Sequence, residues 1–335
     1  MGKVFLRILL LAALLLAGTP LQAQAPRTPH ARSGESALRT ERLSEAVAYL
    51  SDTLCGGRRT GTPGGLRAAT WISGRFREAG LQNLGGRGSS YLLPFTVPST
   101  GASAYNVVGM IPGCSDSWVV VGAHFDHLGT LEGKCYPGAD KNASGVAALL
   151  SLADMFQQMR ALGRVYDKGL LLVAFDGKEM NLAGSQALVS ALSAGALVSP
   201  ASGKPIRPAD ISLMVNLDQL GSTLSPPEDG REDYLIALTG SARGSNMALL
   251  NAINDHENIN LELLPDYYGS ADFTRIFYSR ISDQKAFLEA KIPAVMFSSG
   301  ITLNSNKPDD TPKTLNFAIL RRRVLLIYYF LSNRL

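Results

Sequence analysis

The chain has 335 residues, of which 46% are hydrophobic and 18% are charged, and its formal net charge is +4. This composition is ordinary for a globular protein, and so small and dispersed a positive charge gives no support for nucleic-acid binding. The length suits one large α/β domain better than two independent domains. The sequence does not determine the oligomeric state. It also leaves open which of Cys55, Cys114 and Cys135 would pair in an oxidising compartment.

The first residues have the features of a secretory signal peptide in the usual order. Lys3 and Arg7 form a basic start, an apolar run follows at 8–18, and small residues precede cleavage positions after Ala23 and Ala25. A membrane anchor is the weaker alternative, because the apolar run is short for a membrane span.

These features predict the organisation of the whole chain. We expect residues 1–25 to be a signal peptide, 26–40 a flexible leader and 41–335 a single α/β domain. The protein is therefore expected to be exported to the periplasm or beyond the cell, without membrane association after cleavage.

Hydrophobic periodicity predicts strands and helices that alternate along the domain. Apolar runs predict strands at 105–111, 118–122, 170–175, 211–217, 234–239 and 292–297. Apolar residues at helical spacing predict helices at 44–54, 66–79, 142–159, 182–193, 245–256 and 315–331. The first two strands are expected to be adjacent. The alternation predicts an α/β fold: a three-layer sandwich with a central mixed, mainly parallel sheet flanked by helices.

Polar motifs follow several of these strands, where sheets of this kind carry their chemistry. The motifs are His-x-Asp at 124–126, Gly-Ala-Asp-Lys-Asn-Ala-Ser-Gly at 138–145, Lys-Glu at 178–179, Asn-x-Asp at 216–218 and Asn-x-Pro-x-Asp-Thr at 306–311. A histidine with a carboxylate two residues later is a common metal-ligand arrangement, because the carboxylate holds the imidazole in place. Each motif alone has an equally good structural explanation, such as a turn. The ordered set is stronger evidence for a site.

The ordered set resembles the family of co-catalytic zinc aminopeptidases and glutaminyl cyclases, from about Ser44 to the C-terminus. In that family the pair at 178–179 is Glu-Glu, followed by Gly-Ser as at 184–185, and Ser-Asp-His stands at 282–284. The resemblance implies a zinc-exopeptidase fold, hydrolysis at the N-termini of peptides or proteins, and Zn²⁺ as cofactor.

The resemblance also implies roles for particular residues. His124 and Asp218 match ligands of the first zinc, Glu179 matches a ligand of the second, and Asp126 lies behind His124. Two further aspartates, Asp283 and Asp310, are expected in the cleft.

Three positions depart from the family pattern. Lys141 stands where the family has the carboxylate that bridges both zinc ions, Lys178 where it has the general base, and Asn306 where it has the last histidine ligand. A hydrolytic zinc site normally has three protein ligands and a water, whereas one position here keeps two ligands and the other keeps one. An ammonium repels a divalent ion by about 8 kcal/mol at ~4 Å with an effective dielectric near 20.

We therefore expect an exported zinc-aminopeptidase-like protein without peptidase activity and without bound metal. In this interpretation Lys141 and Lys178 replace the zinc ions as counter-charges for the remaining carboxylates, and a peptide-binding cleft is retained. Two alternatives stay open: an active metallo-exopeptidase with a reduced one-zinc site, and a structural or partner-binding protein. A deprotonated Lys178 acting as base belongs to the first alternative.

Overall fold

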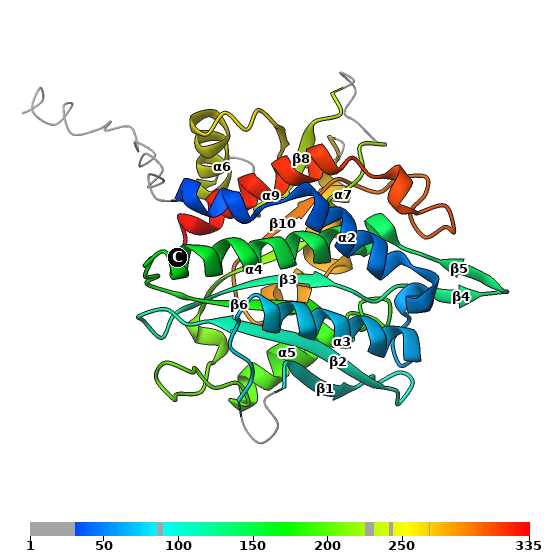
Figure 1. Ribbon diagram of the computed structural model, residues 1–335, viewed down its shortest axis with the longest axis horizontal. Coiled ribbons are helices and arrows are strands. Elements are labelled where there is room, and N and C mark those ends of the chain that lie inside the picture. Colours follow the sequence, from blue (N-terminus) through cyan, green and yellow to red (C-terminus); the bar gives the residue numbers. More distant parts are fainter. Residues whose placement is uncertain (1–30, 86–89, 225–230, 241–243, 268) are drawn as a thin grey trace, which may run out of the picture.

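The computed structural model describes residues 31–335 except 86–89, 225–230, 241–243 and 268 (Figure 1). The predicted signal peptide at 1–25 lies outside the described residues, as do residues 26–30 of the predicted leader. Within the described ranges, no helix is both long enough and apolar enough to cross a membrane.

An eight-stranded mixed sheet forms the centre of the protein, in the order β1-β2-β6-β3-β7-β10-β8-β9. Its strands are β1 (Leu92–Thr96), β2 (Ser103–Ile111), β3 (Trp118–His124), β6 (Gly169–Phe175), β7 (Ile211–Leu217), β8 (Tyr234–Leu238), β9 (Glu262–Leu264) and β10 (Ala294–Ser298). The pairs β6-β3, β3-β7, β7-β10 and β8-β9 are parallel, and the other three are antiparallel. The predicted mixed, mainly parallel sheet is therefore confirmed.

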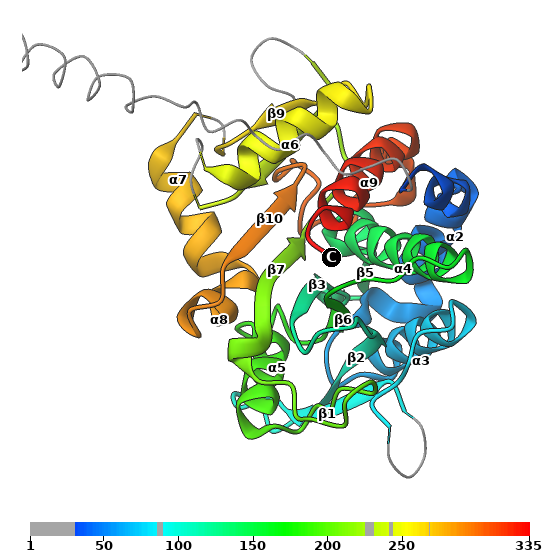
Figure 2. The same ribbon diagram turned by 90° about the vertical axis from the view of Figure 1, so that its left-hand side faces the viewer.

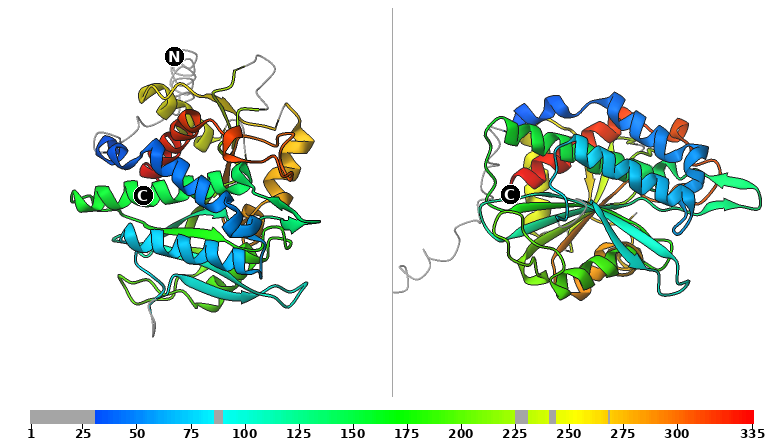
Figure 3. Two further views of the ribbon diagram at one scale, coloured as in Figure 1. Left: turned by 45° about the vertical axis from the view of Figure 1, so that its right-hand side comes forward. Right: turned by 60° about the horizontal axis from the view of Figure 1, so that its bottom comes forward.

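Helices cover both faces of the sheet and complete three layers (Figures 2 and 3). One face is covered by α2 (Thr40–Ser51), α3 (Pro63–Glu78), α4 (Gly145–Ala161), α6 (Ser245–His256) and α9 (Phe317–Ser332). The other face is covered by α5 (Ala183–Ala194) and α8 (Gln284–Glu289). Each layer packs its apolar side chains against alternate residues of the strands, because successive strand residues point to opposite faces.

Short elements connect these layers. They are the 3₁₀ helices η1 (Ala31–Ala37), η2 (Thr53–Arg58), η4 (Pro208–Asp210) and η6 (Pro312–Thr314), the π-helical turns η3 (Ala139–Ser144) and η5 (Phe277–Ile281), the helix α7 (Ala271–Ile276), and the hairpin of β4 (Gly129–Leu131) and β5 (Lys134–Tyr136). Apolar periodicity did not reveal most of them, because each is too short to repeat a pattern.

Two predictions about the N-terminal half are wrong. The strands predicted at 105–111 and 118–122 are not adjacent, since β6 lies between them and pairs with both. Every residue of β6 is buried, and burial on both sheet faces favours this interior place whatever its position in the chain. The leader predicted at 26–40 is structured from Ala31 onward, because η1 packs on α4 and Gln158 donates to the carbonyl of Ser33 at 3.0 Å.

A buried arginine ties η2 to the loops at the end of β3 and before η3. The guanidinium of Arg58 is fully buried and donates to the carbonyl oxygens of Leu50, Phe125, Pro137 and Gly138 at distances of 2.5–2.9 Å. Burial lowers the pKa of Arg58 to about 10, so the side chain still carries its charge at neutral pH. One side chain therefore fixes four main-chain positions around the predicted site.

Replacement of this arginine tests the arrangement. We expect Arg58→Met to lower the free energy of unfolding by at least about 3 kcal/mol, because several buried carbonyl groups lose their donor. Urea denaturation followed by circular dichroism measures the change. Arg59→Met is the matched control, since this neighbouring arginine is exposed and its loss should change stability by no more than ~0.5 kcal/mol. Equal effects of the two substitutions would contradict the assigned role of Arg58.

Candidate functional site

The predicted site residues meet at one edge of the sheet. Strands β3, β6, β7 and β10 run parallel, so their carboxyl ends lie at the same edge. His124 is the last residue of β3, Lys178 and Glu179 follow β6, Asp218 follows β7, and Asn306 lies in the loop after β10. The convergence expected from the sequence is therefore present in the structure.

The two lysines contact one carboxylate, and one of them also contacts Asn306. Oε1 of Glu179 lies 3.0 Å from Nζ of Lys141 and 3.4 Å from Nζ of Lys178. Lys141 also donates to Oδ1 of Asn306 at 2.6 Å. We call Lys141, Lys178 and Glu179 the lysine–glutamate cluster. Its side chains are 11%, 9% and 19% exposed respectively, so the charges are largely removed from water.

The cluster shifts the pKa values of its members in different directions. Burial raises the pKa of Glu179, but the ammonium groups of Lys178 and Lys141 outweigh burial and lower this pKa to about 2. Burial lowers the pKa of Lys178, but the carboxylates around it, those of Asp218 and Glu179 first, outweigh burial and raise it above its usual range. The pKa of Lys141 is lowered, by burial first and then by the charge of Lys178. Lys178 is therefore held in its protonated form.

The histidine at the end of β3 lies between two aspartates. Nε2 of His124 is 3.4 Å from Oδ1 of Asp218, and Nδ1 is 3.1 Å from the carbonyl oxygen of Asp126. The carboxylate of Asp126 is farther from Nδ1, at 3.5 Å, and accepts the backbone N–H groups of Lys178 and Glu179 at 2.9 Å each. The sequence predicted that this carboxylate would orient the imidazole. The main-chain carbonyl is the nearer partner, and the carboxylate fixes the loop after β6 instead.

A chain of hydrogen bonds holds Asp218 from its other side. Ser282 donates to Oδ2 of Asp218 at 2.6 Å, and Asn216 donates to the hydroxyl of Ser282 at 2.8 Å. Burial raises the pKa of Asp218, but Lys178 and His124 outweigh burial and hold it far below its usual range. Burial likewise lowers the pKa of His124, but hydrogen bonds with the neighbouring aspartates raise it to about 9. His124 and Asp218 are therefore an ion pair at neutral pH.

The two aspartates predicted for the cleft lie behind the site. Asp310 accepts the backbone N–H groups of Asp140 and Lys141 at 2.7 and 3.0 Å, so it shapes η3 rather than facing a ligand. Asp283 is fully buried, and burial raises its pKa to about 6. Neither residue lines the cavity at this edge of the sheet. Motif position gave their place in the chain but not the direction of their side chains.

A cavity of about 210 Å³ opens beside the lysine–glutamate cluster. Lys141, Lys178, Asp218 and Asn306 line its polar side together with Gln219, Ser298 and Ser305. The first four are residues that the sequence singled out, so the cavity lies beside the predicted site.

The apolar side of the cavity was missed by the sequence analysis. It is formed by Tyr267, Phe277, Ile281, Met296 and Ile301. The rings of Tyr267 and Phe277 stack with their centroids 4.2 Å apart. Apolar residues at intervals of four, at 273, 277 and 281, are the signal that could have revealed this helical segment.

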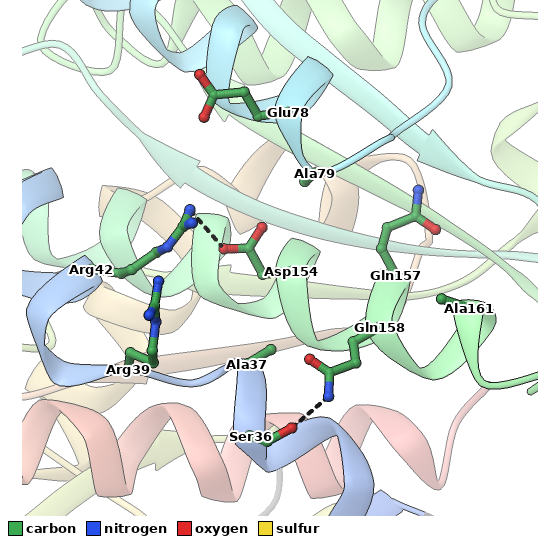
Figure 4. Close-up of a pocket in the computed structure, with 10 residues that line it drawn as sticks. All are labelled: Ser36, Ala37, Arg39, Arg42, Glu78, Ala79, Asp154, Gln157, Gln158 and Ala161. Carbon is green, nitrogen blue, oxygen red and sulfur yellow. Dashed lines mark hydrogen bonds and ion pairs between the residues drawn. The ribbon is translucent and has the colours of Figure 1, made fainter.

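A second cavity, of about 510 Å³, lies among α2, α3, α4 and the end of η1 (Figure 4). It contains an ion pair between Arg42 and Asp154 at 3.7 Å, together with other side chains of both charges, and none of the predicted site residues. Of the other histidines, His256 is exposed and lies 2.8 Å from Glu257. The three cysteines are free thiols, and none lines the cavity at the sheet edge.

The residues at the sheet edge do not fit a pair of zinc ions. Two ammonium groups lie within 3.4 Å of the Glu179 oxygen on which the second ion would depend. Across the described part of the chain, no three or more His, Cys, Asp and Glu side chains are grouped so that they could hold a metal ion. Repulsion from the lysines opposes a divalent ion at this place.

Comparison with known proteins gives matches to both the sequence and the fold. The sequence model of peptidase family M28 matches residues 106–331 of this chain. The chain is 26% identical to the protein YfbL of Escherichia coli (strain K12) over 299 residues, which are 83% of this chain and 83% of that protein.

Two solved structures show the same fold at low sequence identity. The LapA aminopeptidase of Legionella pneumophila superposes with a TM-score of 0.70 at 16% identity, covering 96% of this chain and 78% of that chain. The glutaminyl cyclase of Fimbriiglobus ruber superposes with a TM-score of 0.68 at 18% identity, covering 88% of this chain and 95% of that chain. The resemblance inferred from the motifs and the predicted fold are both confirmed.

Removal of the shared carboxylate tests the lysine–glutamate cluster. We expect Glu179→Gln to lower the free energy of unfolding by about 3 kcal/mol, because two buried ammonium groups lose their common partner. Thermal and urea unfolding at neutral pH measure the loss. Glu289→Gln is the control, since Glu289 is exposed at the end of α8. A Glu179→Gln variant as stable as this control would contradict the role of Glu179 as internal counter-charge.

Proposed function

The chain belongs to peptidase family M28, and we propose that it is a member that does not hydrolyse peptides but retains a cleft that binds them. The observation that carries the proposal is the lysine–glutamate cluster, in which Lys141 and Lys178 share the carboxylate of Glu179. M28 peptidases are zinc-dependent, and here the positive charge at the sheet edge comes from side chains.

The general-base position supports the absence of hydrolysis. A base must accept a proton from the attacking water and pass it to the leaving amine. Lys178 is protonated at neutral pH, because the surrounding carboxylates raise its pKa. This direction opposes the alternative in which Lys178 acts as the base, since that role needs a lowered pKa.

The ligand positions support the same proposal. The amide oxygen of Asn306 accepts a hydrogen bond from the ammonium of Lys141 at 2.6 Å. His124 and Asp218 pair with each other, so three of the groups that could bind a metal already have partners inside the protein. A reduced one-zinc site would have to break these contacts.

We further propose that residues 1–25 direct export and are then removed, which places the domain in the periplasm or outside the cell. The proposal rests on the order of basic, apolar and small residues in that segment.

Zinc content and hydrolysis test the proposed function directly. We expect the purified protein, dialysed against zinc and then against buffer, to retain no stoichiometric zinc and to leave aminoacyl-anilides intact. The triple variant Lys141→Asp, Lys178→Glu and Asn306→His should bind zinc stoichiometrically, because it restores two carboxylates and an imidazole around Glu179. Elemental analysis by mass spectrometry and release of the aniline are the two measurements.

A charge-matched control separates ligand geometry from charge alone. The double variant Lys307→Asp and Lys313→Glu changes charge at two exposed lysines and should not gain zinc. Tight zinc binding and turnover by the unaltered protein would overturn the proposal. A folded triple variant that stays free of metal would show that the residues have been assigned to the wrong family positions.

A further inference from the structure

We propose that the cavity at the sheet edge recognises the carboxylate of a small apolar ligand, such as the C-terminal residue of a hydrophobic peptide. The inference rests on the proposed function, because it assumes that the lysines rather than metal ions occupy this place. It reverses the preference for peptide N-termini expected from the family resemblance, since an N-terminal ammonium would approach two like charges.

The charged groups that line the cavity favour an anion. They are Lys141, Lys178 and Asp218, two cations and one anion, whereas Glu179, the carboxylate that contacts both ammonium groups, does not line the cavity. The carboxylate of Asp218 is already engaged by Ser282 at 2.6 Å and by His124 at 3.4 Å. The negative charge on the cavity side is thus directed toward neighbouring protein groups.

The two lysines also have N–H donors beyond those that their protein acceptors use. An ammonium group carries three N–H donors. Lys178 has Glu179 as its hydrogen-bond acceptor at 3.4 Å, a long contact, although its side chain is only 9% exposed. Lys141 has two acceptors, Glu179 and Asn306. A ligand carboxylate in the cavity would accept the remaining N–H groups, and buried donors without acceptors are costly.

Apolar side chains form a large part of the cavity and continue outside it. Ile281 and Ile301 line the cavity and are 41% and 46% exposed. Phe273 is 56% exposed and stacks on Phe277 at 6.0 Å, and Leu303 is 86% exposed two residues beyond Ile301. Exposed apolar residues gathered around a cavity mark a binding site. The ligand should therefore carry an apolar group next to its acid.

The volume of the cavity limits the size of that group. At about 210 Å³ it is smaller than the roughly 300–1,000 Å³ of sites for drug-sized ligands. One apolar side chain with its carboxylate is a suitable occupant, and the remainder of a longer peptide would lie outside over the exposed isoleucines and Leu303.

Ligands with the same apolar side chain and opposite charge test the proposal. Isothermal titration calorimetry on the full mature protein would compare N-acetylphenylalanine, which has a free acid, with phenylalaninamide, which has a free amine. We expect the acid to bind at least about 10-fold more tightly, the size of effect produced by hydrogen bonds to charged groups. Octanoate shows which kind of molecule supplies the carboxylate. If octanoate binds more weakly than N-acetylphenylalanine, the ligand is a peptide end, and if it binds more tightly, the ligand is an aliphatic acid.

Variants connect the binding to the lysines. Lys178→Gln should weaken N-acetylphenylalanine binding at least about 10-fold, and Lys141→Gln provides the same test if the first variant does not fold. Lys307→Gln is the matched control, because this exposed lysine follows Asn306 but does not line the cavity. Its affinity for the acid should equal that of the unaltered protein.

Other results would overturn the inference. They are equal or tighter binding of phenylalaninamide, no binding of either acid, or unchanged affinity in folded Lys178→Gln and Lys141→Gln variants. The zinc and hydrolysis assays decide the proposed function separately. If the protein binds neither zinc nor acids, the proposed loss of hydrolysis stands and the proposed carboxylate site is ruled out.

Discussion

Two buried ammonium groups that share one carboxylate are the constraint on which the rest of the site depends. Lys141 comes from η3, and Lys178 and Glu179 come from the loop after β6, so the shared oxygen joins segments that are far apart in sequence. Asn306 adds the loop after β10 through its contact with Lys141. Buried charges are tolerated when they are paired and hydrogen-bonded. The carboxylates of Glu179 and Asp218 can therefore stay at this sheet edge because Lys141, Lys178 and His124 lie beside them.

The loops around the cluster are held by contacts to main-chain atoms. Arg58 donates to four carbonyl groups, Asp126 accepts the N–H groups of Lys178 and Glu179, and Asp310 accepts those of Asp140 and Lys141. Such contacts depend on the path of the chain and need no metal ion. They fix the shape of the sheet edge, and they place a folded cavity beside the cluster.

The sequence predicted most of this because parallel strands bring their carboxyl ends together, so motifs after 118–122, 170–175 and 211–217 had to meet. It could not predict that β6 lies between β2 and β3, because neighbours in a sheet are chosen by burial on both faces and not by order in the chain. It placed Asp283 and Asp310 in the cleft, since a motif gives spacing and not side-chain direction. The apolar side of the cavity escaped notice because Tyr267, Met296 and Ile301 come from separate segments without a shared motif.

The lysines at positions 141 and 178 affect both metal binding and the charge of the ligand that the cavity can accept. A carboxylate at position 141 or 178 would attract divalent ions and amines, whereas an ammonium there repels both and attracts acids. Hydrolysis by a zinc pair and recognition of a carboxylate by these lysines therefore exclude each other at this sheet edge. Shared fold with aminopeptidases and glutaminyl cyclases does not determine which of the two the chain performs, because function belongs to the side chains of the site. In this chain the side chain of Lys178 is only 9% exposed, and a carboxylate that reached it would both accept its unused N–H donors and offset its charge.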